Sequence, residues 1–313
     1  MVSTLDLAGR DLLSLFDLAP DEVAFVLDTA LAQKRAWAHG ERSRPLEGRA
    51  VALIFQKPSM RTRVSFEVAC SRLGAKPIVL GGGETVFSRG ESVYDSAKVL
   101  ERYCDAIVIR TYEQSLVEEI ARVASVPVVN ALTDDYHPCQ GLADLLTIRE
   151  HKGDLEGLSL AYVGDGNNMT NTYLEAGALT GMHVSIATPE GFEPPPAVVQ
   201  TARVKAEGTG ARIVVGHDPV GAVSGADIVA TDTWASMGQE SEHEARLTAF
   251  EPFRVDTALM AHAEPDAIFM HCLPAHRGEE VTDEVIDSTA SVVFDEAENR
   301  LHAQQALLSL IVR

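Results

Sequence analysis

Cysteine and long apolar runs are both scarce in this sequence. Its 313 residues include four cysteines, and no two of them form a CxxC pair. So few cysteines do not make a disulfide framework, and we expect free thiols. The first twenty residues lack the basic start and apolar run of a signal peptide, which favours a cytoplasmic location. No run of about 18 apolar residues is present, so we expect no membrane span.

Positive charge is also scarce, because 26 Lys and Arg stand against 46 Asp and Glu, for a formal net charge of −20. Proteins that bind DNA or RNA present a basic face, so we expect no nucleic-acid partner. A small anion can still be held where a few arginines and helix N-termini gather.

Apolar β-rich runs alternate with amphipathic stretches along nearly the whole chain. Continuous apolar runs are typical of strands buried on both faces, as in parallel sheets covered by helices. Strands are expected at 50–55, 77–80, 106–110, 126–130, 158–163, 183–188, 212–215, 227–231, 267–271 and 291–294. Helices are expected at 64–73, 92–102, 116–124, 139–151, 171–180 and 297–312.

This alternation predicts an α/β fold of two domains, each a mostly parallel sheet flanked by helices. The length also suits two domains. The alternation of strand-like and helix-like segments is interrupted after Asn130, and a long helix follows. We therefore predict one domain over residues 1–138, completed by the C-terminal helix 297–313, and a second over 139–296.

Ligands of open α/β sheets bind beyond the carboxyl ends of the strands, and the first polar cluster there is 57–63, Lys-Pro-Ser-Met-Arg-Thr-Arg. Ser59 can cap the helix that follows, whose first N–H groups have no intrahelical partner. Arg61 and Arg63 add guanidinium groups that suit phosphate. The cluster is either a phosphate cradle or a capped helix with solvated arginines.

Two more clusters follow the next strands. Arg110 closes an apolar strand, and His137 and Gln140 open the long helix. His137 can donate to a developing oxyanion, and Gln140 can bind an amide or carbonyl. The alternatives are a solvated strand end for Arg110 and a helix cap for His137.

The turn Gly164-Asp165-Gly166-Asn167-Asn168 matches half of a dinucleotide fingerprint. A third glycine is missing, and so is the acidic residue after the next strand. An NAD-dependent oxidoreductase is therefore a weak alternative, and a tight turn that presents two amides suits the pattern better.

Asp232 and Cys272 each follow a predicted strand of the second domain. Asp232 can receive a cationic amine, and Ser236 with its backbone can hold a carboxylate. Neighbours in a strand point to opposite faces, which disfavours a nucleophilic dyad of Cys272 with His271. We interpret Cys272 as a polar residue that lines a pocket.

Together these clusters resemble the aspartate and ornithine carbamoyltransferase family over almost the whole chain. The family's phosphate motif appears as Ser59–Arg63 followed by Val64–Glu67, and its His-Pro-x-Gln motif as His137–Gln140. Features of the ornithine branch are Asp232 with Ser236–Gly238, then His271–Pro274, then Glu296–Arg300.

The resemblance implies a role for each matching residue. It implies that carbamoyl phosphate is bound by Ser59, Met60, Arg61, Thr62, Arg110, His137, Gln140, Cys272, Leu273 and Arg300. It implies that L-ornithine is bound by Asn168, Asp232, Ser236 and Met237. Arg61, Arg110, His137 and Cys272 are the implied catalytic residues. No metal and no cofactor are expected, and the family is typically a homotrimer or a multiple of trimers.

The implied reaction is attack of the ornithine side-chain amine on the carbamoyl carbon, through a tetrahedral intermediate, giving L-citrulline and phosphate. Within the same class, the alternatives are a modified ornithine or putrescine as acceptor. Putrescine has no α-carboxylate that Ser236–Gly238 could bind, so this segment argues against putrescine as the acceptor. A non-catalytic binding relative is the third alternative.

Two positions depart from the family pattern. Met60 stands where Thr is more common, and Val86 stands where the family usually offers Gln to carbamoyl phosphate. Because the side chain of Val86 cannot form a hydrogen bond, we expect weaker carbamoyl phosphate binding, or compensation by Ser88 or Arg89.

Overall fold

The computed structural model describes residues 5–81, 90–235 and 243–313. The chain divides into two compact units, unit 1 (Met1–Leu146 with Glu298–Arg313) and unit 2 (Thr147–Ala297). The division falls inside α5 (Pro138–Lys152). The boundary predicted from the sequence lies at the start of that same helix.

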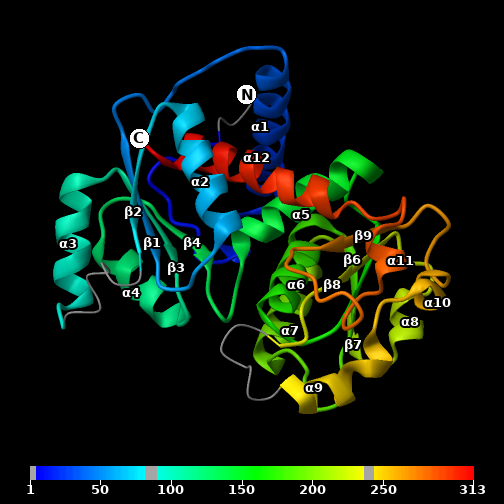
Figure 1. The fold of residues 1–313 in the computed structure, drawn as a ribbon. Coiled ribbons are helices and arrows are strands. Elements are labelled where there is room, and N and C mark those ends of the chain that lie inside the picture. Colours follow the sequence, from blue (N-terminus) through cyan, green and yellow to red (C-terminus); the bar gives the residue numbers. More distant parts are fainter. Residues whose placement is uncertain (1–4, 82–89, 236–242) are drawn as a thin grey trace. The chain divides into compact units, whose positions relative to one another are not determined.

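Unit 1 contains a four-stranded parallel sheet in the order β2-β1-β3-β4 (Figure 1). Its strands are β1 (Ala50–Phe55), β2 (Lys76–Leu80), β3 (Ala106–Arg110) and β4 (Val128–Leu132). β1 and β3 are the two inner strands, and β3 is buried at every residue. Burial on both faces explains why their sequences are continuous apolar runs.

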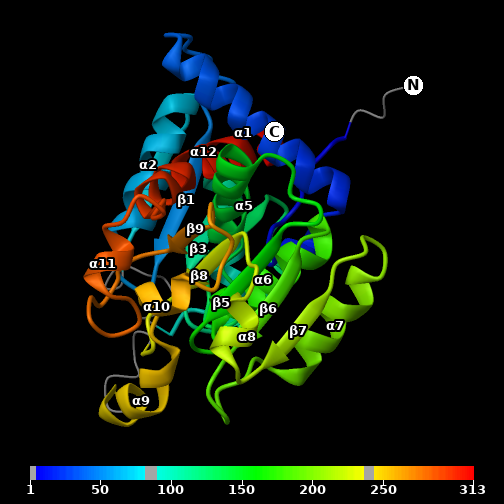
Figure 2. The same cartoon turned by 90° about the vertical axis from the view of Figure 1, so that its right-hand side faces the viewer.

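Helices cover both faces of this sheet. α3 (Val93–Tyr103) and α4 (Gln114–Val123) pack on Ala52 and Ile54 of β1 and on Ile107 of β3. Val51 and Leu53, which point to the opposite face, are also fully buried. Figures 1 and 2 show α12 (Val293–Ile311) beside α1 (Pro20–Ala38) and α2 (Met60–Leu73). A short 3₁₀ turn (Leu15–Asp17) precedes α1.

Unit 2 contains a five-stranded parallel sheet in the order β7-β6-β5-β8-β9 (Figure 2). Its strands are β5 (Ser159–Val163), β6 (His183–Ala187), β7 (Ile213–Gly216), β8 (Ile228–Thr231) and β9 (Ile268–His271). Its helices are α6 (Asn168–Thr180), α7 (Pro196–Ala206), α8 (Pro219–Val223), α9 (His243–Phe250), α10 (Thr257–Met260) and α11 (Asp283–Ile286), with a 3₁₀ turn at Glu251–Phe253. Val163, Val229 and Phe269 join α8, α10 and α11 in one apolar cluster.

The secondary structure differs from the prediction at several positions. The strand predicted at 291–294 is wrong: Ser291 forms an isolated bridge with Phe269, and Val293 already begins α12. The acidic residues Asp295 and Glu296 in the first turn favour this helix start. β4 begins two residues later than predicted, and α1 is one of several helices that were not predicted.

No helix in the described ranges combines the length and the apolar character that a membrane span requires.

Candidate active site

The loop after β1 leads into a capped helix, as the sequence predicted. Ser59 is the N-cap of α2, and its side chain accepts a hydrogen bond from the N–H of Thr62 at 3.2 Å. Met60 is the first helical residue, and its side chain is 73% exposed. Only the backbone of Met60 therefore contributes to the helix start, and a side chain other than Thr leaves the cap intact.

Lys57, in the same loop, contacts the segments that follow β3 and β4. Its side chain is almost completely buried, pairs with Asp134 and lies over the ring of Tyr112, with Nζ 4.2 Å from the ring centroid. This ion pair links the segment after β1 to the segment after β4.

Arg300 of α12 joins two other predicted residues. Its Nη1 donates to Oε1 of Gln140 at 2.7 Å, and its Nη2 donates to Oγ1 of Thr62 at 2.9 Å. Gln140 in turn donates to Asp144 at 2.7 Å. These are all buried hydrogen bonds, so the guanidinium of Arg300 has one orientation, set by α2 and α5.

His137 lies in a strongly positive environment. It is buried, and burial lowers its pKa well below the usual 6.5. The positive charges of Arg300, Arg110 and Arg61 lower this pKa further, in that order. The imidazole is therefore neutral at pH 7, and the cluster concentrates positive charge where a phosphate group can bind.

Unit 2 gathers a second set of predicted residues at the ends of adjacent strands. Asp232 follows β8 and is 8% exposed. Its Oδ2 accepts from Nδ2 of Asn167 at 2.9 Å, and its Oδ1 accepts from Sγ of Cys272 at 3.3 Å. Because β5, β8 and β9 are neighbours in the sheet, the segments that follow them meet at the carboxylate of Asp232.

Asn167 was not predicted, whereas its neighbour Asn168 was implied by the family resemblance. Asn167 is the N-cap of α6, and its Oδ1 accepts from the N–H groups of Met169 and Thr170. The same side chain thus caps a helix and binds Asp232. The helix was predicted to begin at residue 171, whereas α6 begins at Asn168, and the usable signal was the asparagine at 167, a residue type that favours capping.

His271 and Cys272 do not form a dyad, as predicted. Nδ1 of the buried His271 accepts from the N–H of Leu273 at 2.9 Å, and its Nε2 therefore donates to Glu280 at 3.1 Å. Leu273 has a φ of +58°, in the left-handed region that side chains rarely adopt. The bond to His271 helps to hold this conformation. Glu280 was not predicted from the sequence.

Two groups in the described part of the chain could offer donor atoms to a metal. They are Asp232 with His271 and Cys272, and His276 with Glu279 and Glu280, each with donor atoms within 4.8 Å of one another. In the first group both ring nitrogens of His271 are already hydrogen-bonded. We interpret that group as a hydrogen-bond network.

The turn that resembles a dinucleotide site is closed by a neighbouring loop. The N–H of Gly166 donates to Phe192 O at 2.9 Å, and a Cβ at Gly166 would lie 2.4 Å from that oxygen. Asn167 already occupies N–H groups at the start of α6. The turn is therefore not open to a pyrophosphate, and the N–H groups of Met169 and Thr170 are already hydrogen-bonded to Asn167. Both observations argue against the oxidoreductase alternative.

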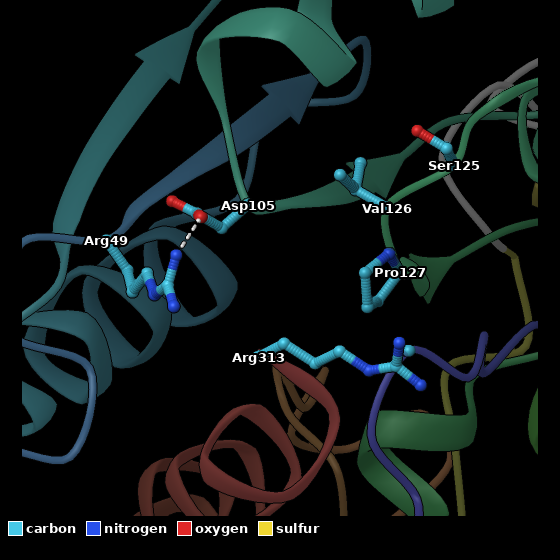
Figure 3. Close-up of a pocket in the computed structure, with 7 residues that line it drawn as sticks. Arg49, Asp105, Ser125, Val126, Pro127 and Arg313 are labelled. Atoms are coloured by element: carbon cyan, nitrogen blue, oxygen red, sulfur yellow. Dashed lines mark hydrogen bonds and ion pairs between the residues drawn. The ribbon is translucent and has the colours of Figure 1, made fainter.

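Unit 1 has a cavity of about 250 Å³ at the opposite end of its sheet. Figure 3 shows its lining residues Arg49, Asp105, Ser125, Val126, Pro127 and Arg313. Arg49 pairs with Asp105 at 2.9 Å. These residues precede β1, β3 and β4 or end the chain, so the cavity contains none of the predicted site residues.

Comparison with known proteins decides the family. A model of the aspartate/ornithine carbamoyltransferase carbamoyl-P binding domain matches residues 10–150, and a model of that family's Asp/Orn binding domain matches residues 156–311. The chain belongs to the aspartate/ornithine carbamoyltransferase family. The two models fall on the two sheets, β1–β4 and β5–β9, and the predicted two-domain α/β fold is confirmed.

Individual members of the family match the chain over its full length. It is 52% identical over 308 residues to an ornithine carbamoyltransferase of Anoxybacillus flavithermus, covering 98% of each chain. The ornithine carbamoyltransferase structure from Pyrococcus furiosus matches with a TM-score of 0.96 and 52% identity, covering 99% of each chain. The one from Thermus thermophilus matches with a TM-score of 0.86 and 41% identity, covering 97% of this chain and 99% of that one.

Two groups of residues named from the sequence lie outside the described residues. One is Ser236, Met237 and Gly238, of which the first two are expected to bind ornithine, and the other is Val86 with Ser88 and Arg89, which were expected to compensate for it.

Proposed function

We propose that this carbamoyltransferase transfers the carbamoyl group of carbamoyl phosphate to the side-chain amine of L-ornithine, giving L-citrulline and phosphate. Relatives about half identical over 98% of the chain are named ornithine carbamoyltransferases. The observation that carries the choice of acceptor is Asp232, a nearly buried carboxylate that Asn167 and Cys272 hold in place. A buried carboxylate suits a cationic diamino acid and repels an acidic acceptor such as aspartate.

Unit 1 supplies the groups that bind carbamoyl phosphate in this proposal. The phosphate accepts hydrogen bonds from the start of α2, at Ser59, Met60, Arg61 and Thr62, and from the guanidinium of Arg61. Arg110, His137, Gln140 and Arg300 bind the carbamoyl group or the phosphate. The geometric support is Arg300, which bonds both Thr62 and Gln140.

Unit 2 supplies the groups that bind ornithine. We assign an ammonium group of ornithine to Asp232 and assign further contacts to Asn168, Ser236 and Met237. Cys272 and Leu273 are assigned to the reacting carbamoyl group. The hydrogen bond from Cys272 to Asp232 and the unusual backbone of Leu273 support a specialised role for this segment.

The chemistry needs no covalent enzyme intermediate. The side-chain ammonium of ornithine loses a proton to solvent, and the lone pair of the resulting amine forms a bond to the carbamoyl carbon, which places negative charge on the carbonyl oxygen. Collapse of this tetrahedral intermediate restores the carbonyl and breaks the bond from that carbon to the phosphate oxygen, and the nitrogen passes its second proton to the phosphate as it leaves. Arg61, Arg110 and neutral His137 stabilise the oxyanion and the leaving group.

We also propose that the enzyme is a cytoplasmic homotrimer or a multiple of trimers. The four cysteines are free thiols, which suits a reducing compartment. Large apolar side chains are exposed on two helices of unit 1, and an assembly would cover such residues: Met60, Val64, Tyr94, Val99 and Tyr103. Sedimentation velocity gives the mass of the assembly directly.

A steady-state assay with carbamoyl phosphate and a panel of amines tests the proposed reaction. Ornithine, N-acetylornithine, putrescine and aspartate are each supplied, and both phosphate release and the ureido product are measured. We expect product with ornithine alone. A higher kcat/KM with another amine would contradict the assigned acceptor, and no ureido product with any amine would contradict carbamoyl transfer itself.

A further inference from the structure

A buried ion pair lies next to the proposed ornithine residues. Asp165 follows β5, Arg246 lies on α9, and Oδ2 of Asp165 is 3.0 Å from Nη1 of Arg246. Each side chain is 9% exposed. Burying two charges is costly even when they pair, so such a pair calls for a specific role.

Arg246 also binds the backbone next to Asp232. The same Nη1 donates to the carbonyl oxygen of Trp234 at 2.8 Å. The guanidinium lies 5.0 Å from the ring centroid of Phe192 and 5.8 Å from that of Phe250, which confines it. Arg246 therefore ties the segment after β5 to the segment after β8.

A second link joins the same two segments. Asn167, two residues after Asp165, donates to the carboxylate of Asp232, two residues before Trp234. The segments are thus joined twice, once directly by a side chain and once through Arg246. Asp232 is itself one of the two points of attachment, and Trp234 is the other.

We propose that Asp165 and Arg246 are positioning residues for ornithine. They hold residues 232–234 against residues 165–167 and so keep the carboxylate of Asp232 where an ammonium group binds. Neither residue is assigned a contact with substrate. Residues on loops depend on such supports, and a displacement of about 1 Å can reduce a rate about 100-fold. This inference rests on the proposed function, because it takes Asp232 as the ornithine ligand.

Burial raises the pKa of Asp165 to about 6, and the nearby charge of Arg246 opposes that rise. At pH 8 the carboxyl group is therefore ionised, and the pair with Arg246 is complete.

The first test replaces Arg246 by methionine, which keeps the apolar stem and removes the charge. At pH 8 we expect the KM for ornithine to rise roughly 10- to 100-fold, with the KM for carbamoyl phosphate unchanged. Arg203→Met is the matched control, because Arg203 of the same unit also donates to a backbone carbonyl, that of Ile213 at 3.3 Å. We expect this control to keep both KM values.

The second test removes both charges. Asp165→Asn and Arg246→Met each leave one buried charge alone, whereas the double variant leaves none. We therefore expect the rise in ornithine KM of the double variant to be smaller than the product of the two single effects. Because the double variant leaves no unpaired buried charge, it can be measured even if a single variant does not fold. A normal ornithine KM in the double variant would overturn the proposal.

Two other results would overturn the inference. One is a folded Arg246→Met enzyme with an unchanged ornithine KM. The other is an equal rise in the KM values of both substrates, which indicates a general loss of structure. Failure of the proposed function looks different, because the wild-type enzyme would then form no citrulline from ornithine.

Discussion

Arg300 donates a 2.7 Å hydrogen bond to Gln140, although the two residues are 160 positions apart in the sequence. The second donor of the same guanidinium binds Thr62, 238 positions away. The C-terminal helix α12 thereby supports both the start of α2 and the start of α5, where several of the proposed carbamoyl phosphate residues lie. The predicted closing helix is thus part of the site in unit 1.

Replacement of Arg300 by methionine should impair carbamoyl phosphate use. Loss of a positioned charge from an anion site costs roughly 10²–10³-fold in rate, and we expect this loss in kcat/KM for carbamoyl phosphate. Arg313→Met is the control, because Arg313 follows α12 and donates to the carbonyl oxygen of Ala8, away from Thr62 and Gln140. A normal kcat/KM for carbamoyl phosphate in Arg300→Met would refute the role of Arg300.

Asp232→Asn should affect ornithine and spare carbamoyl phosphate. Removal of one charge from a buried pair costs about 2–5 kcal/mol, so the ornithine KM should rise by about 30-fold or more. Initial rates with each substrate varied in turn measure this split. Asp218→Asn is the control, because Asp218 caps α8 after β7, three strands from β8 in the sheet, and asparagine also caps helices. Equal losses for the two substrates would mean that Asp232 does not bind ornithine.

His137 should stay neutral in the folded enzyme throughout the physiological range. Its burial, with Arg300, Arg110 and Arg61 nearby, lowers its pKa well below 6.5. Its imidazole signal in NMR spectra, assigned by comparison with His137→Gln, should not titrate between pH 6 and 8. A titration midpoint near 6.5 would contradict the positive cluster.

The same shift makes stability depend on pH. Below about pH 6.5 the unfolded chain takes up a proton at His137 that the folded chain does not, so stability falls as pH falls. The slope from this one group is at most about 1.4 kcal/mol per pH unit. Urea unfolding of wild type and His137→Gln at several pH values measures it, and parallel curves for the two proteins would contradict the shift.

Gly166→Ala should destabilise unit 2. The added Cβ would lie 2.4 Å from the backbone oxygen of Phe192 and 2.4 Å from the nitrogen of Pro194, so the backbone must move. Forced displacements of this kind cost about 1–3 kcal/mol. Gly216→Ala is the control, because its Cβ would have no neighbour within 4 Å. Equal unfolding free energies for the two variants would contradict the close approach at Gly166.

Local patterns in the sequence were sufficient to predict most of the strands and the N-cap of one helix. The apolar runs of β1 and β3 gave their exact bounds, and Ser59 was placed correctly at the N-cap of α2. Both signals depend only on neighbouring residues. The run at 291–294 misled for the same reason, because two valines and a phenylalanine favour a strand locally. The structure uses Val293 to begin α12.

Contacts between distant segments could not be read in this way. Nothing beside Arg246 in the sequence marks it as a partner of Asp165, because the two lie on elements that only the order of strands brings together. Glu280 and Asn167 were missed for the same reason. Asn167 donates to Asp232, 65 residues further along the chain, and Glu280 accepts hydrogen bonds from His271 and from the N–H of His276 in the fold that follows β9.

The amino-acid sequence by itself determined the α/β class, the family and the types of residue available for chemistry, because periodicity, capping and motifs act over short stretches. The tertiary structure decided which of those residues meet. Strand order sets which loops are neighbours, and burial sets which charges must pair. For that reason only the fold shows Asp232 held between Asn167 and Cys272, and Arg300 joined to Thr62 and Gln140.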